Sequence, residues 1–161
     1  MSIIEIRVFG DPKAQPRVKS RVFFKSGKAI SGVYTPSCAN GWKEAIAIAA
    51  MADHPFPPLA GPLRMDVTFY FARPKRLLRK KDPDGPIWHT DKPDRDNLDK
   101  CVLDTLTACG YWHDDRQVCM GTIRKFYAGR TVPAAGAEIV IRTMDNERPS
   151  GIIYEQEGNT I

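Results

Sequence analysis

Two stretches of the chain alternate between apolar and polar residues, as half-buried strands do. The alternation runs from Ile4 to Val8 and, over a longer stretch, from Leu63 to Phe71. Because successive side chains of a strand point to opposite faces, one face can be buried while the other meets solvent. The sequence also predicts a hairpin over residues 22–34 that turns near Ser26 and Gly27, and a closing pair of strands over residues 118–127 and 138–142.

Two further segments repeat their apolar residues at helical spacing. Residues 37–53 are rich in alanine and predict a first helix. Residues 97–109 have an apolar face that begins with Leu98 and Val102, which predicts a second helix. Gly110 is well suited to end that helix, because glycine readily adopts the left-handed conformation found there.

The order of these elements predicts an α+β fold, in which a mixed β-sheet packs against two main helices in a single domain. Strands and helices do not alternate as βαβ units. A chain of 161 residues, 42% of them hydrophobic, is long enough for one core. We expect the domain to cover residues 1–143 and a polar tail to follow over residues 144–161. Residues 73–93 predict a long loop, and such loops in small domains are more often functional than idle.

Composition argues against a membrane or secreted protein. No apolar run reaches the ~18–20 residues of a membrane span. The first ten residues alternate like a strand and lack the charged-then-apolar layout of a signal peptide. The four cysteines contain no CxxC pair. We therefore expect reduced thiols in a cytoplasmic protein, and a zinc site is the less favoured alternative.

Charge is unevenly distributed along the chain. The formal net charge is +5, yet residues 11–28 and 73–81 are strongly basic, whereas residues 91–115 are rich in aspartate. One charged run is usually a solvated face. Two basic runs around an acidic one suggest instead a phosphate-binding surface that surrounds a metal site.

Aspartates occur in pairs on both sides of the second predicted helix. Asp94 and Asp96 lie two residues apart before it, so in an extended segment their side chains point the same way. Asp114 and Asp115 follow the turn that ends it. If the chain folds back at this turn, the two pairs converge into a site for a hard divalent cation. The alternatives are that Asp96 or Asn97 caps the helix and that the second pair belongs to an ordinary turn.

Lys100 and His113 lie beside these carboxylates in the sequence. Lys100 and Asp104 are four residues apart on the exposed helix face, where an ion pair would contribute ~0.3–0.5 kcal/mol. The functional alternative is that Lys100 faces the scissile phosphate and stabilises the charge that develops in the transition state. His113 could shuttle protons, although a histidine in a turn needs no such role.

These residue types suit phosphodiester hydrolysis. Mg²⁺ prefers oxygen ligands and keeps several waters, so a few carboxylates suffice to bind it. A metal-bound water can serve as the nucleophile while the metal offsets charge on the leaving oxygen. The Walker A, GxSxG and HExxH motifs of other chemistries are missing from the sequence.

The segment KPDRDNLDKCVLDTL, followed by GYWHDDRQV, closely resembles the signature of the RusA family of Holliday junction resolvases. That signature is KPDxDNLxKxxLDxL followed by a DDxQV-like segment. VFGDPKAQPRVKSR and VYTPSCANGWKEAI resemble the family's flanking regions more loosely, and the resemblance covers about residues 3–142. The residues that match the signature are Asp94, Asp96, Asn97, Lys100, Asp104, Asp114, Asp115 and Gln117.

The resemblance implies a homodimeric, Mg²⁺-dependent endonuclease that cuts four-way DNA junctions symmetrically, with Mn²⁺ as an alternative ion. It carries the catalytic, metal-binding aspartates onto Asp94, Asp96 and Asp115, and the essential lysine onto Lys100. Whether Asp114 is also a ligand stays open. A C₂ dimer suits this task because it presents two equivalent sites to the two equivalent strands of a junction.

We expect the two basic runs to contact the DNA backbone, which positions DNA without reading its sequence. Two other functions stay open. A related metal nuclease would act on flaps or other branched DNA, and a non-catalytic protein would bind branched DNA without Mg²⁺ and cleave nothing. The expected backbone contacts are Arg17, Lys19, Arg21, Arg73, Arg76, Arg79, Lys80 and Lys81.

Overall fold

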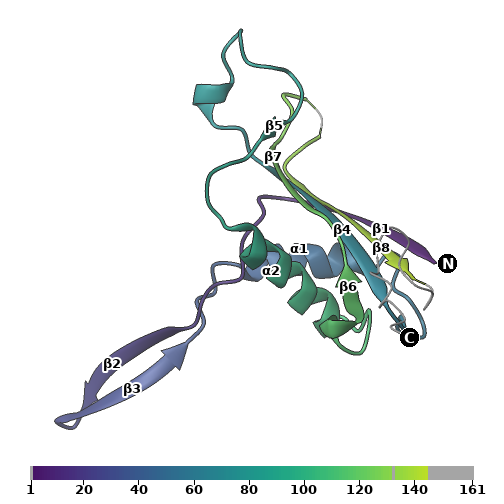
Figure 1. Ribbon diagram of the computed structural model, residues 1–161. Helices are drawn as coiled ribbons and strands as arrows, with labels where there is room; N and C mark the ends of the chain where they lie inside the picture. The colour runs from purple at the N-terminus through teal and green to yellow at the C-terminus, as the bar shows by residue number, and fades with distance from the viewer. Residues whose placement is uncertain (1, 132, 145–161) are drawn as a thin grey trace, which may run out of the picture.

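A mixed β-sheet and two helices form the body of the protein, and a hairpin extends away from it (Figure 1). The structure is a computed structural model that describes residues 2–131 and 133–144. The expected tail therefore lies, apart from Met144, outside the described residues. The strands are β1 (Ile3–Phe9), β2 (Lys19–Lys25), β3 (Lys28–Tyr34), β4 (Leu63–Phe71), β5 (Ile87–Trp88), β6 (Val118–Met120), β7 (Ile123–Tyr127) and β8 (Gly136–Thr143). The helices are α1 (Asn40–Ala50) and α2 (Arg95–Ala108), with 3₁₀ turns η1 (Lys75–Leu77) and η2 (Asp115–Gln117).

β4 is the central strand of the sheet. The strand order is β1-β8-β4-β7-β5, and β6 also pairs with β4. β8 runs antiparallel to β4 and β7 runs parallel to it, which confirms the prediction of a mixed sheet in an α+β domain. The prediction that residues 118–127 and 138–142 pair with each other is wrong, because β4 lies between them and pairs with both.

The strand predicted over residues 118–127 is in fact two strands, β6 and β7, separated at Gly121 and Thr122. The chain passes so close to β4 at Gly121 that a Cβ atom there would lie 1.9 Å from the carbonyl oxygen of Met65. Glycine is therefore required at this position. The carboxylate of Asp66 accepts a hydrogen bond of 3.0 Å from the Thr122 amide, which ties the break to β4.

The alternation along β4 builds the core. Every second residue of β4, from Leu63 to Phe71, is buried, and the residues between are partly exposed. Both helices pack over the buried face, and the helices predicted over residues 37–53 and 97–109 are confirmed with shifted ends. No helix in residues 2–131 and 133–144 is long and apolar enough to cross a membrane. The buried helix residues are Trp42, Ile46 and Ala50 of α1 and Leu98, Cys101, Val102, Thr105 and Leu106 of α2.

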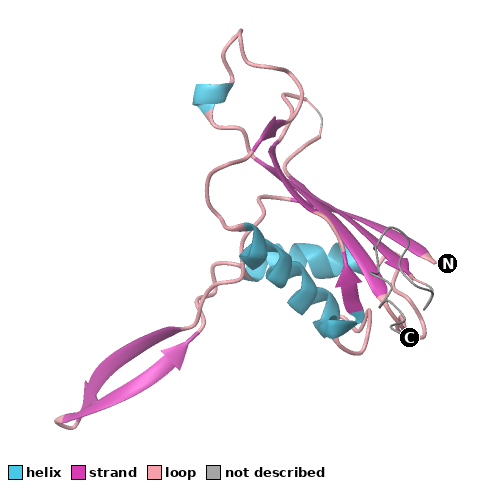
Figure 2. Cartoon of the chain, in the orientation of Figure 1, coloured by secondary structure: helices cyan, strands magenta, loops and turns pink. Residues whose placement is uncertain are grey.

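The hairpin of β2 and β3 is a separate two-stranded sheet, and its prediction is confirmed (Figure 2). Ser26 and Gly27 form its turn with positive φ angles of 51° and 75°. Glycine adopts such angles without steric cost, which explains why the strand pattern breaks there. Chain segments on either side of the hairpin connect it to the body beside the start of α2 (Figure 1).

Candidate active site

Two carboxylates at the N-terminus of α2 have at most a weak partner among the described residues. Asp94 occupies the N-cap position with extended backbone, yet its side chain makes no capping hydrogen bond in the described part of the chain. Asp96 lies in the first turn, and the closest polar contact of its carboxylate is the Asn97 amide at 3.5 Å. Both residues are exposed. The alternative that Asp96 or Asn97 caps the helix is wrong, because the cap position belongs to Asp94.

The segment before Asp94 is fixed to the sheet by β7. The Nζ atom of Lys125 donates hydrogen bonds to the carbonyl oxygens of Asp91 (2.9 Å) and Pro93 (2.6 Å). The carboxylate of Asp91 accepts from the Tyr127 hydroxyl at 2.5 Å and from Arg76 at 2.8 Å. Both donors lower the pKa of Asp91 below its usual range, and the hydrogen bond from Tyr127 is the largest single cause of this lowering. Asp91 is therefore engaged in the fold, and the contacts around it position Asp94.

The chain that leads into the hairpin meets α2 at the same place. The backbone amide of Gln15 donates a hydrogen bond of 2.8 Å to the carbonyl oxygen of Asn97. This contact places the first basic run next to Asp94 and Asp96. The cations Arg17, Lys19 and Arg21 follow directly and are all exposed.

Lys100 lies four residues after Asp96, so the two side chains are neighbours on the exposed face of α2. Its Nζ atom is 3.3 Å from the carboxylate of Asp104, which is the ion pair expected from the spacing. The Lys100 side chain is 60% exposed, and an exposed pair of this kind holds its partners only weakly. The Lys100 side chain is thus not fixed in one position.

Asp99 points to the other side of α2, where it faces β6. It is partly buried, and this burial raises the pKa of its carboxyl, while the charge of Arg95 lowers it by less. The same hollow is lined by Leu103 and Met120. A carboxyl with a raised pKa in an apolar hollow is a poorer ligand for Mg²⁺ than an exposed carboxylate.

The second pair of aspartates has two different environments. Asp114 is the N-cap of η2, where its side chain accepts a hydrogen bond of 3.0 Å from the Arg116 amide. Gln117 completes this capping box and donates to the carbonyl oxygens of Leu59 (3.1 Å) and Gly61 (3.2 Å). Asp115 is exposed, and its carboxylate bonds to no residue that the structure describes. Asp114 therefore stabilises the turn, whereas Asp115 is available for a ligand.

The structure places Asp94 at the N-cap and Asp96 in the first turn of α2, and it places Asp115 beyond the other end of the helix. Val118, just after η2, lies opposite Leu63 of β4, whereas Lys125, which holds Pro93, lies opposite Phe69. Six strand residues separate these two levels, or roughly 20 Å. Within residues 2–131 and 133–144, no group of three or more His, Cys, Asp or Glu side chains could hold a metal ion. Convergence of the three aspartates at one ion stays a prediction.

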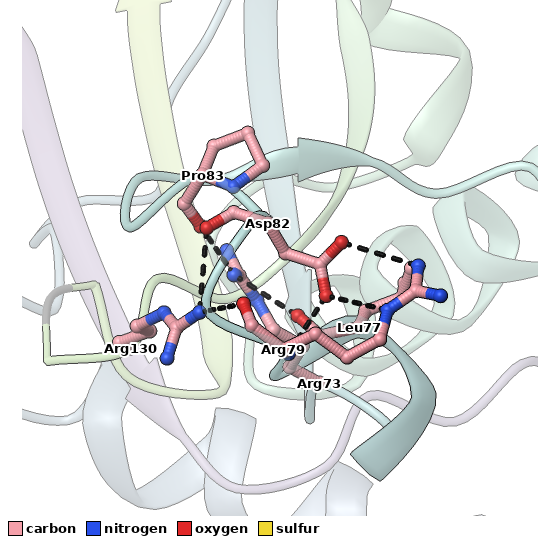
Figure 3. Close-up of polar contacts among 6 residues, drawn as sticks. All are labelled: Arg73, Leu77, Arg79, Asp82, Pro83 and Arg130. Carbon is pink, nitrogen blue, oxygen red and sulfur yellow. Dashed lines mark hydrogen bonds and ion pairs between the residues drawn. The ribbon is translucent and has the colours of Figure 1, made fainter.

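The guanidinium of Arg73 stabilises the long loop by hydrogen bonds to backbone carbonyl oxygens (Figure 3). It donates to the carbonyl oxygens of Ala128 (3.0 Å), Pro83 (2.6 Å) and Leu77 (3.4 Å), and also to that of Gly85. These contacts give Arg73 a structural role of its own, in addition to the DNA contact predicted from the sequence.

Most other cations of the loop lie on its surface. Arg79 pairs with Asp82, and its hydrogen bonds lower the pKa of that carboxyl (Figure 3). Arg130 donates to the carbonyl oxygens of both residues and so closes the loop from the opposite side. Lys80 and Lys81 are exposed and form no ion pair with the residues that the structure describes. The loop thus presents free and loosely paired cations on a fixed backbone.

The hairpin has a cationic face and a neutral face. Cross-strand partners in an antiparallel pair share a face, so the register sorts the side chains. Phe24 and Val33 of the neutral face are 78% and 75% exposed, which is unusual for apolar residues of this size. The cationic face comprises Lys19, Arg21, Phe23, Lys25, Lys28, Ile30 and Tyr34. The neutral face comprises Ser20, Val22, Phe24, Ala29, Ser31 and Val33.

Sequence reasoning missed two kinds of residue at this site. Lys25 and Lys28 were not among the residues singled out, although the two-residue spacing of cations along β2 could have indicated that they share a face with Lys19 and Arg21. Lys125, which fixes the segment before Asp94, was missed, and so was the contact of Gln117 with Leu59, although Gln117 itself matches the family signature. These contacts join residues that are distant in sequence, so a local sequence pattern does not predict them.

Comparisons with known proteins identify the family of this chain. The model of the family described as endodeoxyribonuclease RusA matches residues 10–142. The chain is also 32% identical over 133 residues to the Bacillus subtilis (strain 168) protein named "Uncharacterized protein YqaN", an alignment that covers 80% of this chain and 90% of that protein. The family match includes both basic runs, all of α2 and the turn that carries Asp115.

Proposed function

Because this chain belongs to the RusA family of endodeoxyribonucleases, we propose that it resolves four-way DNA junctions by Mg²⁺-dependent hydrolysis of phosphodiester bonds. One observation carries the proposal. Asp94 and Asp96 both lie at the start of α2, exposed and without capping bonds to the described residues, while neighbouring segments present cations. Structural aspartates at a helix start would be expected to cap it.

Asp94 and Asp96 fit a hard cation, because their carboxylate oxygens are exposed and uncommitted. We assign Asp115 as the third metal ligand on the family signature, although one chain does not place it beside the other two. When bound, Mg²⁺, or Mn²⁺ in its place, supplies an activated water and offsets charge on the leaving oxygen. The positive end of the α2 dipole favours both anionic side chains and an anionic substrate there.

Lys100 is proposed to act on the phosphate. It lies one turn after Asp96 on the exposed face and is held only by Asp104. In the proposed reaction its ammonium group leaves Asp104 and donates to a phosphate oxygen, where negative charge grows in the transition state. Catalysis by Asp94, Asp96, Asp115 and Lys100 then divides into metal binding by the carboxylates and charge stabilisation by the lysine.

The basic runs are proposed to hold the DNA backbone on both sides of this site. Arg17, Lys19 and Arg21 approach from the hairpin, while Arg76, Arg79, Lys80 and Lys81 approach from the long loop that Arg73 organises. Such contacts add affinity for any DNA, so selectivity for junctions must come from the shape of a larger assembly.

A homodimer supplies that assembly in the proposal, since a junction has two equivalent strands to cut. The reaction is assigned to the cytoplasm, because all four cysteines are free, as thiols are in a reducing compartment.

A cleavage assay on a synthetic mobile four-way junction tests the proposal. Symmetric incision that needs Mg²⁺ is expected, with little cutting of linear duplex of the same sequence. Faster cutting of flaps or three-way junctions than of the four-way junction would assign the chain to another branched-DNA nuclease. Tight binding without cleavage under any divalent cation would make it a non-catalytic binding protein.

A further inference from the structure

Three aromatic side chains form a row on the partly exposed face of the sheet, opposite the buried one. Trp88 of β5 lies opposite Phe126 of β7, and Phe126 lies opposite Tyr70 of β4. The ring centroids of Trp88 and Phe126 are 4.3 Å apart with an interplanar angle of 30°, and those of Phe126 and Tyr70 are 6.0 Å apart with an angle of 22°. These three residues are called the aromatic row below. The row crosses three neighbouring strands and ends at Trp88 on the edge strand β5.

Trp88 is the exposed end of the aromatic row. It is 66% exposed, whereas the other two tryptophans, Trp42 and Trp112, are 4% and 2% exposed. Tryptophan is usually well buried, because its large apolar surface favours removal from water. Trp88 therefore presents a broad apolar ring that Phe126 supports from one side and that a partner could cover.

The backbone beside Trp88 is fixed to the sheet. The amide of the next residue, His89, donates a hydrogen bond of 3.1 Å to the carbonyl oxygen of Lys125. The His89 ring is buried and packs against the rings of Phe71 and Tyr127, with centroid distances of 4.1 Å and 4.5 Å. A partner would therefore meet an indole on a fixed strand, and little conformational entropy would be lost on binding.

Cations accompany the aromatic row. Arg124 lies two residues before Phe126 on β7, so the two side chains share a face, and Arg124 is exposed. Burial, followed by the charge of Glu138, raises the pKa of Tyr70, while the charges of Arg7 and Arg124 lower it by less. Both guanidinium groups therefore lie close enough to the Tyr70 hydroxyl to act on its charge. Rings and cations together match a nucleotide, which has a π-face and a phosphate.

We propose that the aromatic row binds unpaired single-stranded DNA, with one base stacked on the exposed indole of Trp88. Every base has a π-face, so such stacking tolerates any sequence. Bases inside a duplex are already stacked on their neighbours, so the site favours strands that have left the duplex. Trp88 precedes Asp94 by six residues, which places it no more than roughly 22 Å away. The inference goes beyond the proposed function, and the site would hold an unpaired strand beside the proposed metal ligands.

Fluorescence anisotropy of a short fluorescein-labelled oligothymidylate, measured in EDTA, tests the site without cleavage. Trp88→Ala should weaken binding at least about fivefold, because the stacking of one base is lost. Trp88→Phe keeps a ring and should weaken binding less. Met51→Ala is the matched control, because Met51 is 74% exposed at the end of α1, and it should bind like the wild type.

The dependence of this affinity on salt separates stacking from charge. Trp88→Ala should leave the slope of log affinity against log salt unchanged. Arg124→Gln should reduce the slope by about 0.7, the value for one phosphate contact on a single strand. A reduction in Trp88→Ala as large as that in Arg124→Gln would overturn the proposal, because Trp88 would then act by positioning a cation.

The fluorescence of Trp88 itself gives a direct signal, because the other two tryptophans are buried. Unlabelled oligothymidylate should quench this fluorescence and protect it from quenching by iodide. Trp88→Phe should lose the DNA-dependent quenching while it still binds the labelled strand. Quenching that persists in Trp88→Phe, or wild-type affinity in Trp88→Ala, would overturn the proposal.

The same variants identify a protein partner in place of DNA. If the emission of Trp88 changes with protein concentration in the absence of DNA, and Trp88→Ala alters the oligomeric state in sedimentation velocity, a second copy of the chain covers the ring and the proposal is overturned. If the wild type and variants bind oligothymidylate as expected but the chain cuts no branched DNA, the proposed function fails and the stacking site stands.

Discussion

The aspartates around α2 share one chemistry but have different partners. Asp91 is engaged by Tyr127 and Arg76, and Asp114 caps η2. Asp94, Asp96 and Asp115 are exposed and bond weakly or not at all to the residues that the structure describes. A carboxylate that stabilises the fold can often be replaced by an amide, whereas a metal ligand depends on its charge. This difference can be measured.

Asp114 and Asp115 form a matched pair for such a measurement. Asp114→Asn keeps an oxygen that can accept from the Arg116 amide, so nearly wild-type cleavage is expected. Asp115→Asn removes a proposed ligand, and a loss of several kcal/mol in transition-state stabilisation corresponds to at least about 100-fold in rate. Single-turnover cleavage of a four-way junction measures both. Equal rates for the two variants would remove Asp115 from the site.

Replacements at Asp94, Asp96 and Lys100 should separate metal binding from charge stabilisation. Asp94→Asn and Asp96→Asn should lose roughly 100-fold or more in cleavage and bind junctions as well as or better than the wild type, since an anion near the phosphate is removed. Raising Mg²⁺ should partly restore them but not Lys100→Ala, which keeps its ligands. Gel-shift and cleavage assays over a Mg²⁺ series measure both effects. Wild-type rates in the two aspartate variants would contradict the nuclease mechanism.

His89 links stability to pH near neutrality. Burial, and secondly the charge of Lys125, lower its pKa below the ordinary 6.5, while Asp91 and Asp11 raise it by less. As the pH falls below about 6.5, His89 binds a proton in the unfolded chain but stays neutral in the folded chain. The free energy of unfolding therefore declines. His89→Phe should keep the stacking with Phe71 and Tyr127 and abolish this decline.

Urea unfolding of the wild type and His89→Phe at about pH 7.5 and about pH 5.5 measures the effect, and the two pH values bracket the ordinary histidine pKa. Comparing the two chains isolates the contribution of residue 89, because the rest of the sequence is the same. A stability difference between the chains that is the same at both pH values would show that His89 does not titrate differently on folding.

At the scale of elements, the hairpin is the feature whose two faces differ most. The register puts Lys19, Arg21, Lys25 and Lys28 on one face and leaves the other without charge. Such a division suggests two partners, with DNA phosphates on the cationic face and protein on the neutral face. The long loop contrasts with it, because its cations surround a backbone that Arg73 holds from within.

Substitutions on the two faces should therefore affect different measurements. Arg21→Gln with Lys25→Gln should reduce the slope of log affinity against log salt by about two, since each lost phosphate contact accounts for about 0.9. Phe24→Ser with Val33→Ser should leave that slope unchanged and weaken the dimer. Binding titrations over a salt series and sedimentation velocity measure the two effects. A changed slope in the neutral-face variant would place DNA on that face.

The core of the molecule lies away from the proposed metal ligands. β4 lies between β8 and β7, both helices pack over its buried face, and the proposed ligands lie at the surface. The metal should therefore matter for chemistry and little for folding. The same arrangement separates the two ends of α2.

Removal of divalent cations should accordingly abolish cleavage and leave the fold intact. With EDTA the junction complex should still form, and the free energy of unfolding should fall by no more than about 1.5 kcal/mol from its value in excess Mg²⁺, as expected for weak binding to exposed ligands. Gel shift and urea unfolding monitored by circular dichroism provide the measurements. A chain that unfolds in EDTA would contradict the view that the core is independent of metal.

The sequence by itself determined most of the elements and the family. Alternation defined β4 at both of its ends, because a strand with one buried face must alternate. Ser26 and Gly27 set the hairpin turn, since few residues adopt its backbone angles. The spacing of Asp94, Asp96 and Lys100 indicated the family, which the match over residues 10–142 confirmed. All of these signals are local, so they can be read along one chain.

Only the tertiary structure decided which elements and side chains meet. It placed β4 between β7 and β8, where local patterns had suggested that the last strands pair with each other. It turned Arg73 inward to four carbonyl oxygens, and it put Asp115 at the far end of α2 from Asp94. One physical reason explains the position of β4, the direction of Arg73 and the position of Asp115. Strand order, loop closure and the direction of a returning chain depend on contacts between residues distant in sequence, and hydrophobic periodicity specifies burial without specifying the partner.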